Sequence, residues 1–277
     1  ACHRRGRAAG LCPLCPRWCP LLGAHRRTNR VQLEEQNREL ARAEGLRRDF
    51  SANVSHEMKT PLQVISGYAE LMKNDMVQPS DRQKFAALIY DEAQTMRSLI
   101  NDVLTLSKLD ESAFENDGAT AINLYAVAQR VAGRLSSFAD DQGVRVRVEG
   151  ASACIAGSET LAEEMLYNLI ENGIRYNHEG GLVTMKVGSE CVEGGLANAA
   201  YQTVVRVSDT GPGIPAELHD KVFERFFRVD KSRSKETGGT GLGLAIVKHA
   251  VMYHGGVIEV ESAEGQGTTF VLRFPSA

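Results

Sequence analysis

An apolar stripe with helical spacing runs from residue 50 to residue 72 and sets one histidine apart from it. The stripe consists of Phe50, Val54, Met58, Leu62, Ile65, Ala69 and Met72. Side chains at intervals of three and four share one face of a helix, and that face is expected to pack on a core. At about 100° per residue, His56 points roughly away from the stripe. We therefore expect a helix that carries an exposed histidine.

The residues that follow His56 suit chemistry at an imidazole. Glu57 is close enough in sequence to orient or deprotonate the ring, and Thr60 lies on the same exposed face. Pro61 cannot donate a hydrogen bond to the Glu57 carbonyl, so we expect a kink one turn past the histidine. The segment also lacks the second histidine of the H-E-x-x-H zinc motif, which argues against a metal site. A solvated surface histidine in a bent helix is the alternative interpretation.

A second amphipathic helix is expected after a turn at Pro79 and Ser80. Its apolar residues are Phe85, Leu88, Ile89, Met96, Leu99, Ile100, Val103, Leu104 and Leu106. This helix is predicted to run antiparallel to the first, and two such hairpins would form a four-helix bundle. Residues 31–49 predict a short coiled-coil lead-in, so we expect a homodimer built on residues 31–112. The alternative for the lead-in is a solitary solvated helix.

Residues 1–30 differ in composition from the rest of the chain. They contain arginines, no acidic residue, and four of the six cysteines with prolines between them, so we predict an irregular leader. Cys12 and Cys15 form a C-x-x-C pair, which is a weak indication of zinc without a second pair of ligands. The formal net charge of -3 gives no reason to expect a nucleic-acid partner. No stretch approaches the ~20 apolar residues of a membrane span.

Residues 118–277 predict a second, α+β domain. The segments 144–149 (V-R-V-R-V-E) and 203–209 (T-V-V-R-V-S-D) alternate as strands do, and helical stretches separate them. Glycines gather at 209–215 (D-T-G-P-G-I-P) and at 238–249 (G-G-T-G-L-G-L-A-I-V-K-H), where a helix is expected to open. Such loops and helix starts offer backbone N–H groups to phosphates. Neither matches the Walker A or the dinucleotide motif, and either alone could be only a tight turn.

In their order, these segments resemble those of the sensor histidine kinases of two-component systems. The series begins with S-H-E-M-K-T-P-L and continues with N-L-I-E-N-G-I-R-Y-N (168–177), D-T-G-P-G-I, F-E-R-F-F-R-V-D (223–230) and G-G-T-G-L-G-L-A-I-V-K. The resemblance covers residues 46–277. It implies an α+β chain in which a helical hairpin forms a dimeric four-helix bundle, followed by an α/β sandwich of the Bergerat, or GHKL, ATP-binding type. A mobile lid is implied between Gly213 and Gly239.

The resemblance also implies an activity and its partners. His56 would accept a phosphoryl group from ATP with Glu57 as base, and the group would pass to an aspartate of a response regulator receiver domain. Thr60 would position a water that hydrolyses the resulting phosphoaspartate. The kinase portion would be cytoplasmic, and an intact protein could be attached to a membrane through a sensor ahead of these residues.

Nine residues fall on positions where the family binds nucleotide, with ATP and Mg²⁺ as the implied cofactors. They are Asn168, Asn172, Arg175, Asp209, Gly211, Gly213, Gly239, Gly241 and Gly243. Asn172 matches the magnesium ligand, Asn168 would help to hold metal and phosphates, and Asp209 would accept the adenine amino group. Arg175 would face the phosphates, which the last three glycines would wrap.

Two residues depart from the family pattern. Gly173 stands where alanine is usual, at a cost of about 1 kcal/mol in helix stability, and Asn177 stands where threonine or serine is usual.

Two functions of other classes are also open. One is a GHKL-type ATPase that forms no phosphoenzyme, and the other is an inactive dimeric scaffold.

Overall fold

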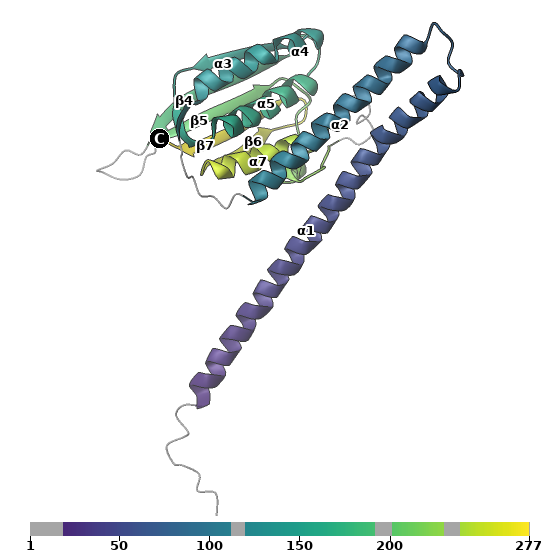
Figure 1. Ribbon diagram of the computed structural model, residues 1–277. Coiled ribbons are helices and arrows are strands. Elements are labelled where there is room, and N and C mark those ends of the chain that lie inside the picture. Colours follow the sequence, from purple (N-terminus) through teal and green to yellow (C-terminus); the bar gives the residue numbers. More distant parts are fainter. Residues whose placement is uncertain (1–18, 112–119, 192–200, 230–238, 277) are drawn as a thin grey trace, which may run out of the picture. The chain divides into compact units, whose positions relative to one another are not determined.

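The computed structural model describes residues 19–111, 120–191, 201–229 and 239–276 (Figure 1). It has two compact units, residues 1–53 and residues 54–277. Within the first unit, the described residues belong to helix α1 (Cys19–Lys73), whose remaining turns lie in the second. All other elements belong to the second unit. No helix among the described residues combines the length and the apolar character needed to cross a membrane.

The start of α1 corrects one prediction. Residues 19–30 are helical, so the irregular leader expected over residues 1–30 is wrong for that part. The physical reason is the position of Pro20, which falls in the first turn, where a helix needs no N–H from it. No further proline occurs before Pro61, and good helix formers predominate from residue 31 onward. Cys12 and Cys15 lie outside the described residues.

Helix α2 (Arg82–Glu111) runs back along α1 after a tight turn, as predicted (Figure 1). Asp75 adopts a positive φ of 53° in this turn, and its Oδ1 accepts a 2.9 Å hydrogen bond from Arg82. The rings of Tyr68 and Phe85 meet edge to face, with 5.2 Å between their centroids. These contacts join the two helices at the closed end of the hairpin.

A five-stranded sheet forms the centre of the α+β domain. Its order is β2 (Arg145–Gly150), β4 (Leu182–Cys191), β5 (Tyr201–Asp209), β7 (Thr268–Pro275) and β6 (Val257–Ser262). β2 and β4 are parallel, and the other neighbours are antiparallel. β1 (Thr120–Asn123) and β3 (Cys154–Gly157) form a separate antiparallel pair. The strands predicted at 144–149 and 203–209 are confirmed, the first with a shift of one residue.

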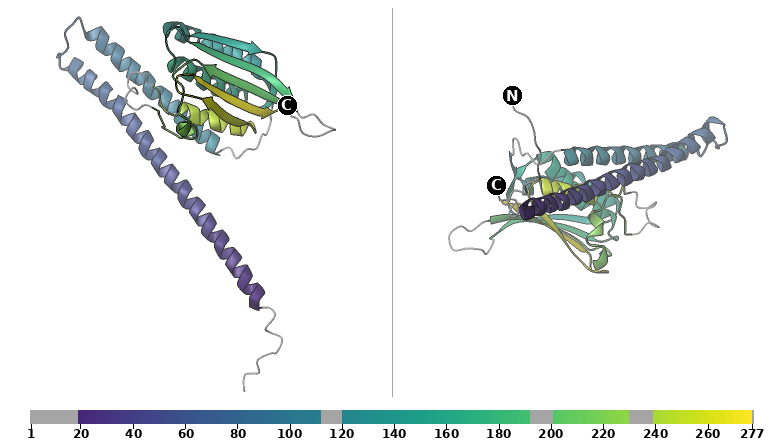
Figure 2. Two further views of the ribbon diagram at one scale, coloured as in Figure 1. Left: turned by 180° about the vertical axis from the view of Figure 1, so that it is seen from behind. Right: turned by 90° about the horizontal axis from the view of Figure 1, so that it is seen from below.

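Three helices cover one face of this sheet, namely α3 (Leu124–Arg134), α5 (Glu159–Arg175) and α7 (Gly243–Tyr253) (Figures 1 and 2). A short helix, α4 (Ser136–Asp141), follows α3. Side-chain caps fix two helix starts: Asn123 accepts from two N–H groups of α3, and Ser158 accepts from Leu161 of α5. The layer between helices and sheet is fully buried at Met165, Leu166, Leu169, Ile170, Met185, Ile246 and Phe274.

A buried histidine ties α7 to the start of α5. His254 follows α7, and its Nδ1 donates to the Ala250 carbonyl at 2.7 Å. Its Nε2 accepts from the Ser158 N–H at 3.2 Å, so the neutral ring satisfies both contacts. Burial lowers the pKa of His254, although the carbonyls of Ala250 and Ser158, which can accept from a protonated ring, oppose the shift. A Cβ at Gly157 would lie 2.2 Å from this ring, which explains the glycine there.

In the segment between Gly213 and Gly239, where a lid is predicted, the described residues contain two 3₁₀ turns. These are η1 (Ala216–Leu218) and η2 (Lys221–Phe223). Phe223 is anchored to the sheet, because its ring meets that of Phe270 edge to face at 6.2 Å. Residues 230–238 lie outside the described residues, and the mobility of this segment stays a prediction.

Candidate nucleotide and phosphotransfer site

His56 lies on the exposed side of α1, as its spacing predicts. Its side chain is 80% exposed, and the nearest charged group is the Glu57 carboxylate, with Oε1 3.6 Å from Nδ1. This distance is too long for a hydrogen bond, yet a small side-chain rotation would close it. The Thr60 hydroxyl contacts the His56 carbonyl at 3.5 Å, one turn along the helix. α1 continues through a buried Pro61, and the kink there stays a prediction.

Asp209 ends strand β5 with one carboxylate oxygen already bonded. Its Oδ1 accepts hydrogen bonds from the N–H groups of Gly211 (2.8 Å) and Thr268 (3.2 Å). Burial raises the pKa of Asp209, and the two backbone donors oppose that rise. No described residue donates to Oδ2, which leaves one oxygen available as an acceptor. A carboxylate held in this way can accept from an amino group.

Close backbone packing shapes the loop around Asp209. Gly213 has a φ of 76°, and a Cβ there would lie 2.0 Å from the Ala263 carbonyl oxygen. Gly267 has a φ of 81°, and its Cβ would lie 2.1 Å from the Asp209 carbonyl oxygen. Gly213 is among the residues predicted from the sequence, whereas Gly267 and Thr268 are not. The short glycine-rich run G-Q-G-T-T at 265–269 was the available signal.

Asn172 and Asn168 occupy successive turns of α5 but differ in their surroundings. The Asn172 side chain is half-buried, and none of the described residues hydrogen-bonds its amide. Asn168 is buried, with 8% of its surface exposed, and its Nδ2 donates to the Glu164 carbonyl at 2.9 Å. A Cβ at Gly243 would lie 2.6 Å from Asn168 Oδ1, so Asn168 packs directly on the start of α7. Asn172 is therefore the more available ligand of the two.

Arg175 points toward α4 in this structure. Its guanidinium pairs with Glu171 on the preceding turn and lies 5.6 Å from the centre of the Phe138 ring. Its expected orientation toward phosphates stays a prediction. Among the described residues, no three His, Cys, Asp or Glu side chains come together as a metal site. The Asn172 amide offers a hard oxygen donor, which fits Mg²⁺ that is held mainly by phosphates and water.

Residues 239–243, called the glycine loop below, lead into α7. The Gly239 carbonyl accepts from Arg228 at 2.6 Å, and the Gly241 carbonyl accepts from the Phe226 N–H at 2.8 Å. Gly241 has a φ of 71°, and a Cβ there would lie 3.0 Å from Phe226. Helix α7 begins at Gly243 without a side-chain cap and without an acidic residue in its first turn. Its first N–H groups and its dipole therefore suit a phosphate.

The glycine loop also contacts helix α2, a contact that the sequence does not predict. The Thr240 hydroxyl donates to Asp102 Oδ2 at 2.7 Å and accepts from the Leu242 N–H at 3.2 Å. Burial raises the pKa of Asp102 to about 6, the hydrogen bond from Thr240 opposes the rise, and the charges of Glu164 and Glu171 add to it. The residues are 138 positions apart, so no local pattern could show the contact.

Two family models match the chain in the order of its domains. The His Kinase A (phospho-acceptor) domain matches residues 46–112, which include α2 and the part of α1 that carries His56. The model described as histidine kinase-, DNA gyrase B- and HSP90-like ATPase matches residues 157–277. Asp209, Asn172 and the glycine loop all lie within this second match.

Curated relatives are similar over most of the chain but are longer. The sensor-like histidine kinase SenX3 of Mycobacterium tuberculosis is 35% identical over 92% of this chain, which spans 60% of that protein. The phosphate regulon sensor protein PhoR of Pseudomonas aeruginosa is 33% identical over 84% of this chain, which spans 51% of its length.

Solved structures share the fold. The histidine kinase AdeS of Acinetobacter baumannii has a TM-score of 0.61 at 24% identity, over 79% of this chain and 97% of that one. Full-length ShkA has a TM-score of 0.57 at 29% identity, over 82% of this chain and 45% of that one. The expected fold class, a helical hairpin followed by an α/β domain, is thus confirmed. With a phosphoacceptor domain on the hairpin and an ATPase domain on the sheet, this chain belongs to the sensor histidine kinases of two-component systems.

Proposed function

We propose that the chain phosphorylates its own His56 with ATP and passes the phosphoryl group to an aspartate of a response regulator receiver domain. The observation that carries the proposal is an exposed histidine beside a carboxylate, in the same chain as an ATPase-type domain whose Asp209 keeps one oxygen available. ShkA, which is 29% identical, was solved with AMPPNP, and this supports a nucleotide as the ligand.

In this proposal, the nucleotide binds between α5, the glycine loop and the end of β5. Asp209 Oδ2 accepts a hydrogen bond from the adenine amino group, while the N–H groups at the start of α7 bind phosphate oxygens. Asn172 holds Mg²⁺, which when bound supplies positive charge to the phosphates. The carboxylate recognises the base, and the helix start holds the reacting end of the nucleotide.

The transfer itself uses His56 and Glu57. Once a side-chain rotation closes the 3.6 Å between Nδ1 and Oε1, the Glu57 carboxylate accepts a hydrogen bond from the Nδ1 proton, so Nε2 keeps its lone pair for attack. A bond forms between Nε2 and the γ-phosphorus, the bond from that phosphorus to the β,γ-bridging oxygen breaks, and ADP leaves with the electron pair. In the second step, the receiver aspartate attacks the same phosphorus and His56 is released.

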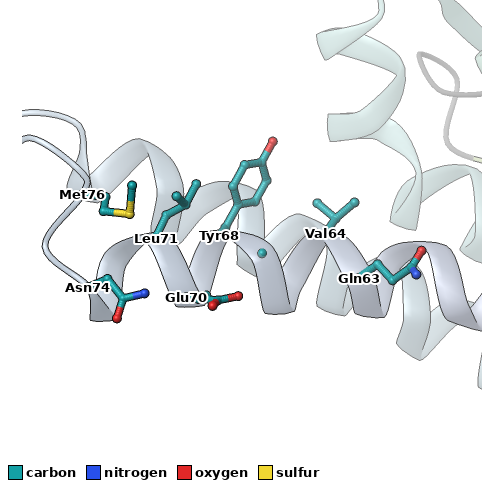
Figure 3. A pocket seen from close by; sticks show the side chains of 8 residues that line it. Gln63, Val64, Tyr68, Glu70, Leu71, Asn74 and Met76 are labelled. Atoms are coloured by element: carbon teal, nitrogen blue, oxygen red, sulfur yellow. The ribbon is translucent and has the colours of Figure 1, made fainter.

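Exposed apolar side chains on the hairpin support a homodimer. The largest are Leu62 (51% exposed), Met76 (70%), Tyr90 (63%) and Leu104 (53%). A groove of about 500 Å³ also lies along α1 near the closed end. Figure 3 shows Val64, Tyr68 and Leu71 on one side of the helix and Glu70 and Asn74 on another. A second hairpin on these apolar residues would complete a four-helix bundle.

The test of the kinase activity is incubation with magnesium and γ-labelled ATP. We expect acid-labile, base-stable label on the chain, absent from His56→Gln and retained by His178→Gln, which replaces another exposed histidine. ATP turnover without label would point to an ATPase that forms no phosphoenzyme. Neither label nor turnover would favour an inactive scaffold.

Phosphatase activity is proposed for Thr60, whose hydroxyl lies one turn from His56. A phosphorylated receiver domain should lose its phosphoryl group faster with the wild-type chain than with Thr60→Ala. Because Thr60 takes no part in the transfer to His56, the variant should still become labelled. Intact phosphatase activity in Thr60→Ala would remove this role.

A further inference from the structure

We propose that Asn177 is a positioning residue for the nucleotide base, because its amide clamps the end of α5 to the strand end that carries Asp209. The inference rests on the proposed function for the identity of the ligand. The clamp itself is a set of hydrogen bonds that join the Asn177 amide to the Gly173 carbonyl in α5, to the Leu182 carbonyl at the start of β4, and to the Thr210 hydroxyl just after β5. Asn177 is not among the nucleotide-binding residues named above.

The Asn177 amide uses its full hydrogen-bonding capacity. Its Nδ2 donates to the carbonyls of Gly173 (3.1 Å) and Leu182 (3.3 Å), which lie in α5 and at the start of β4. Its Oδ1 accepts from the Thr210 hydroxyl (3.0 Å) and from the His178 N–H (3.1 Å). An amide has two donor hydrogens and an oxygen with two lone pairs, so all four are occupied.

Thr210 carries the clamp to Asp209, which precedes it directly in the chain. The Thr210 hydroxyl accepts from the Leu182 N–H at 3.0 Å, and the Thr210 N–H donates to the Leu182 carbonyl at 3.2 Å. The first strand pair of β4 and β5 joins Val183 to Asp209. Side-chain and backbone bonds therefore hold Thr210 on one side of the carboxylate.

Two glycines let this corner close. A Cβ at Gly181 would lie 2.2 Å from Asn177 Oδ1, and a Cβ at Gly211 would lie 2.7 Å from the Tyr176 carbonyl oxygen. Gly211 is also the donor that holds Asp209 Oδ1 at 2.8 Å. The turn after α5 thus packs on Gly211, the residue whose N–H holds the carboxylate. If this turn moved, Gly211 would move with it and the position of the Asp209 carboxylate would change.

The choice of asparagine at this position adds a donor. A threonine or serine hydroxyl can donate one hydrogen bond, so it cannot serve both the Gly173 and the Leu182 carbonyls. Asparagine in this chain satisfies both and still accepts from Thr210. The departure from the family pattern therefore adds one bond between α5 and β4 beside the base site.

The test compares Asn177→Ala with Asn123→Ala in the full chain. Asn123 is the matched control, because its amide also bonds two backbone groups of the same domain but at the start of α3, away from Asp209. The probes are ATP and inosine triphosphate, which lacks the adenine amino group that Asp209 is proposed to accept. Dissociation constants are measured by calorimetry, and stability by urea unfolding.

We expect Asn177→Ala to weaken ATP binding about tenfold and inosine triphosphate binding much less, which reduces the preference for ATP. Asn123→Ala should lower stability but keep the preference, and Asn177→Thr should lie between Asn177→Ala and the wild type. An unchanged preference in a folded Asn177→Ala would overturn the inference and leave the proposed function intact. A wild-type chain that binds neither nucleotide would overturn both.

Discussion

His56 and Asp209 are both proposed to act on one nucleotide, yet their surroundings are opposite. The histidine side chain is 80% exposed and has a single charged neighbour at 3.6 Å. The carboxylate is held by two backbone N–H groups at the end of β5, the central strand of the sheet. In the proposed cycle, His56 must meet first ATP and then a receiver domain, whereas Asp209 recognises one base. His56, which meets two partners in turn, is accessible to both. Asp209, which recognises one base, is held in position before the nucleotide binds.

The largest effect expected from this contrast is on ATP binding. Asp209→Ala removes the proposed acceptor for the adenine amino group, so we expect affinity for ATP to fall about 100-fold or more. His56→Gln should bind ATP as the wild type does, because the exposed imidazole contributes nothing to base recognition. Calorimetric titration of both variants checks this, and equal losses in the two would break the comparison.

A Cβ added to a glycine should destabilise the loop around Asp209 but not the surface of α3. Gly213→Ala places a Cβ near the Ala263 carbonyl at a positive φ, so we expect a loss of about 2–4 kcal/mol in the free energy of unfolding. Gly133→Ala is the control, since α3 leaves open space at Gly133, and it should gain about 0.5–1 kcal/mol. Urea unfolding measures both, and a stable Gly213→Ala would show that the loop relaxes.

The raised pKa of Asp102 predicts that the folded chain becomes less stable as pH rises. Its pKa is raised to about 6 in the folded chain from an ordinary value of 3.8, so the unfolded chain binds fewer protons between these values. The wild type should therefore lose stability from pH 4 to pH 6 relative to Asp102→Asn, by about 1–2 kcal/mol after allowance for solvent screening. A difference that does not change with pH would show that Asp102 is solvated.

His254 predicts a smaller effect of opposite sign. Its folded pKa lies below the ordinary value of 6.5, so the unfolded chain binds more protons as pH falls through 6.5. Stability should drop by about 1 kcal/mol between pH 7.5 and pH 5.5. Urea unfolding of His254→Gln should lack this slope, while exposed His178→Gln should keep it. The same slope in both variants would locate the titration elsewhere.

Local patterns in the sequence were enough to predict the exposed position of His56 and two strands of the sheet domain. The stripe from Phe50 to Met72 fixed the exposed side of α1, and alternation located β2 and β5. The helical start at Cys19 was missed because prolines were counted without their position in a turn. The contacts of Asn177 with Thr210 and of Asp102 with Thr240 span 33 and 138 residues, and periodicity carries no information over such separations.

The uncapped start of α7 has a consequence for how binding can be observed. Its first backbone N–H groups have no side-chain partner, so their protection from solvent deuterium should depend on an anion. Nucleotide should therefore slow amide exchange at Leu244 and Ala245, while Leu166 in the middle of α5 exchanges slowly with or without it. Slower amide exchange in this one turn would show that a nucleotide is bound, even when no phosphoryl transfer takes place.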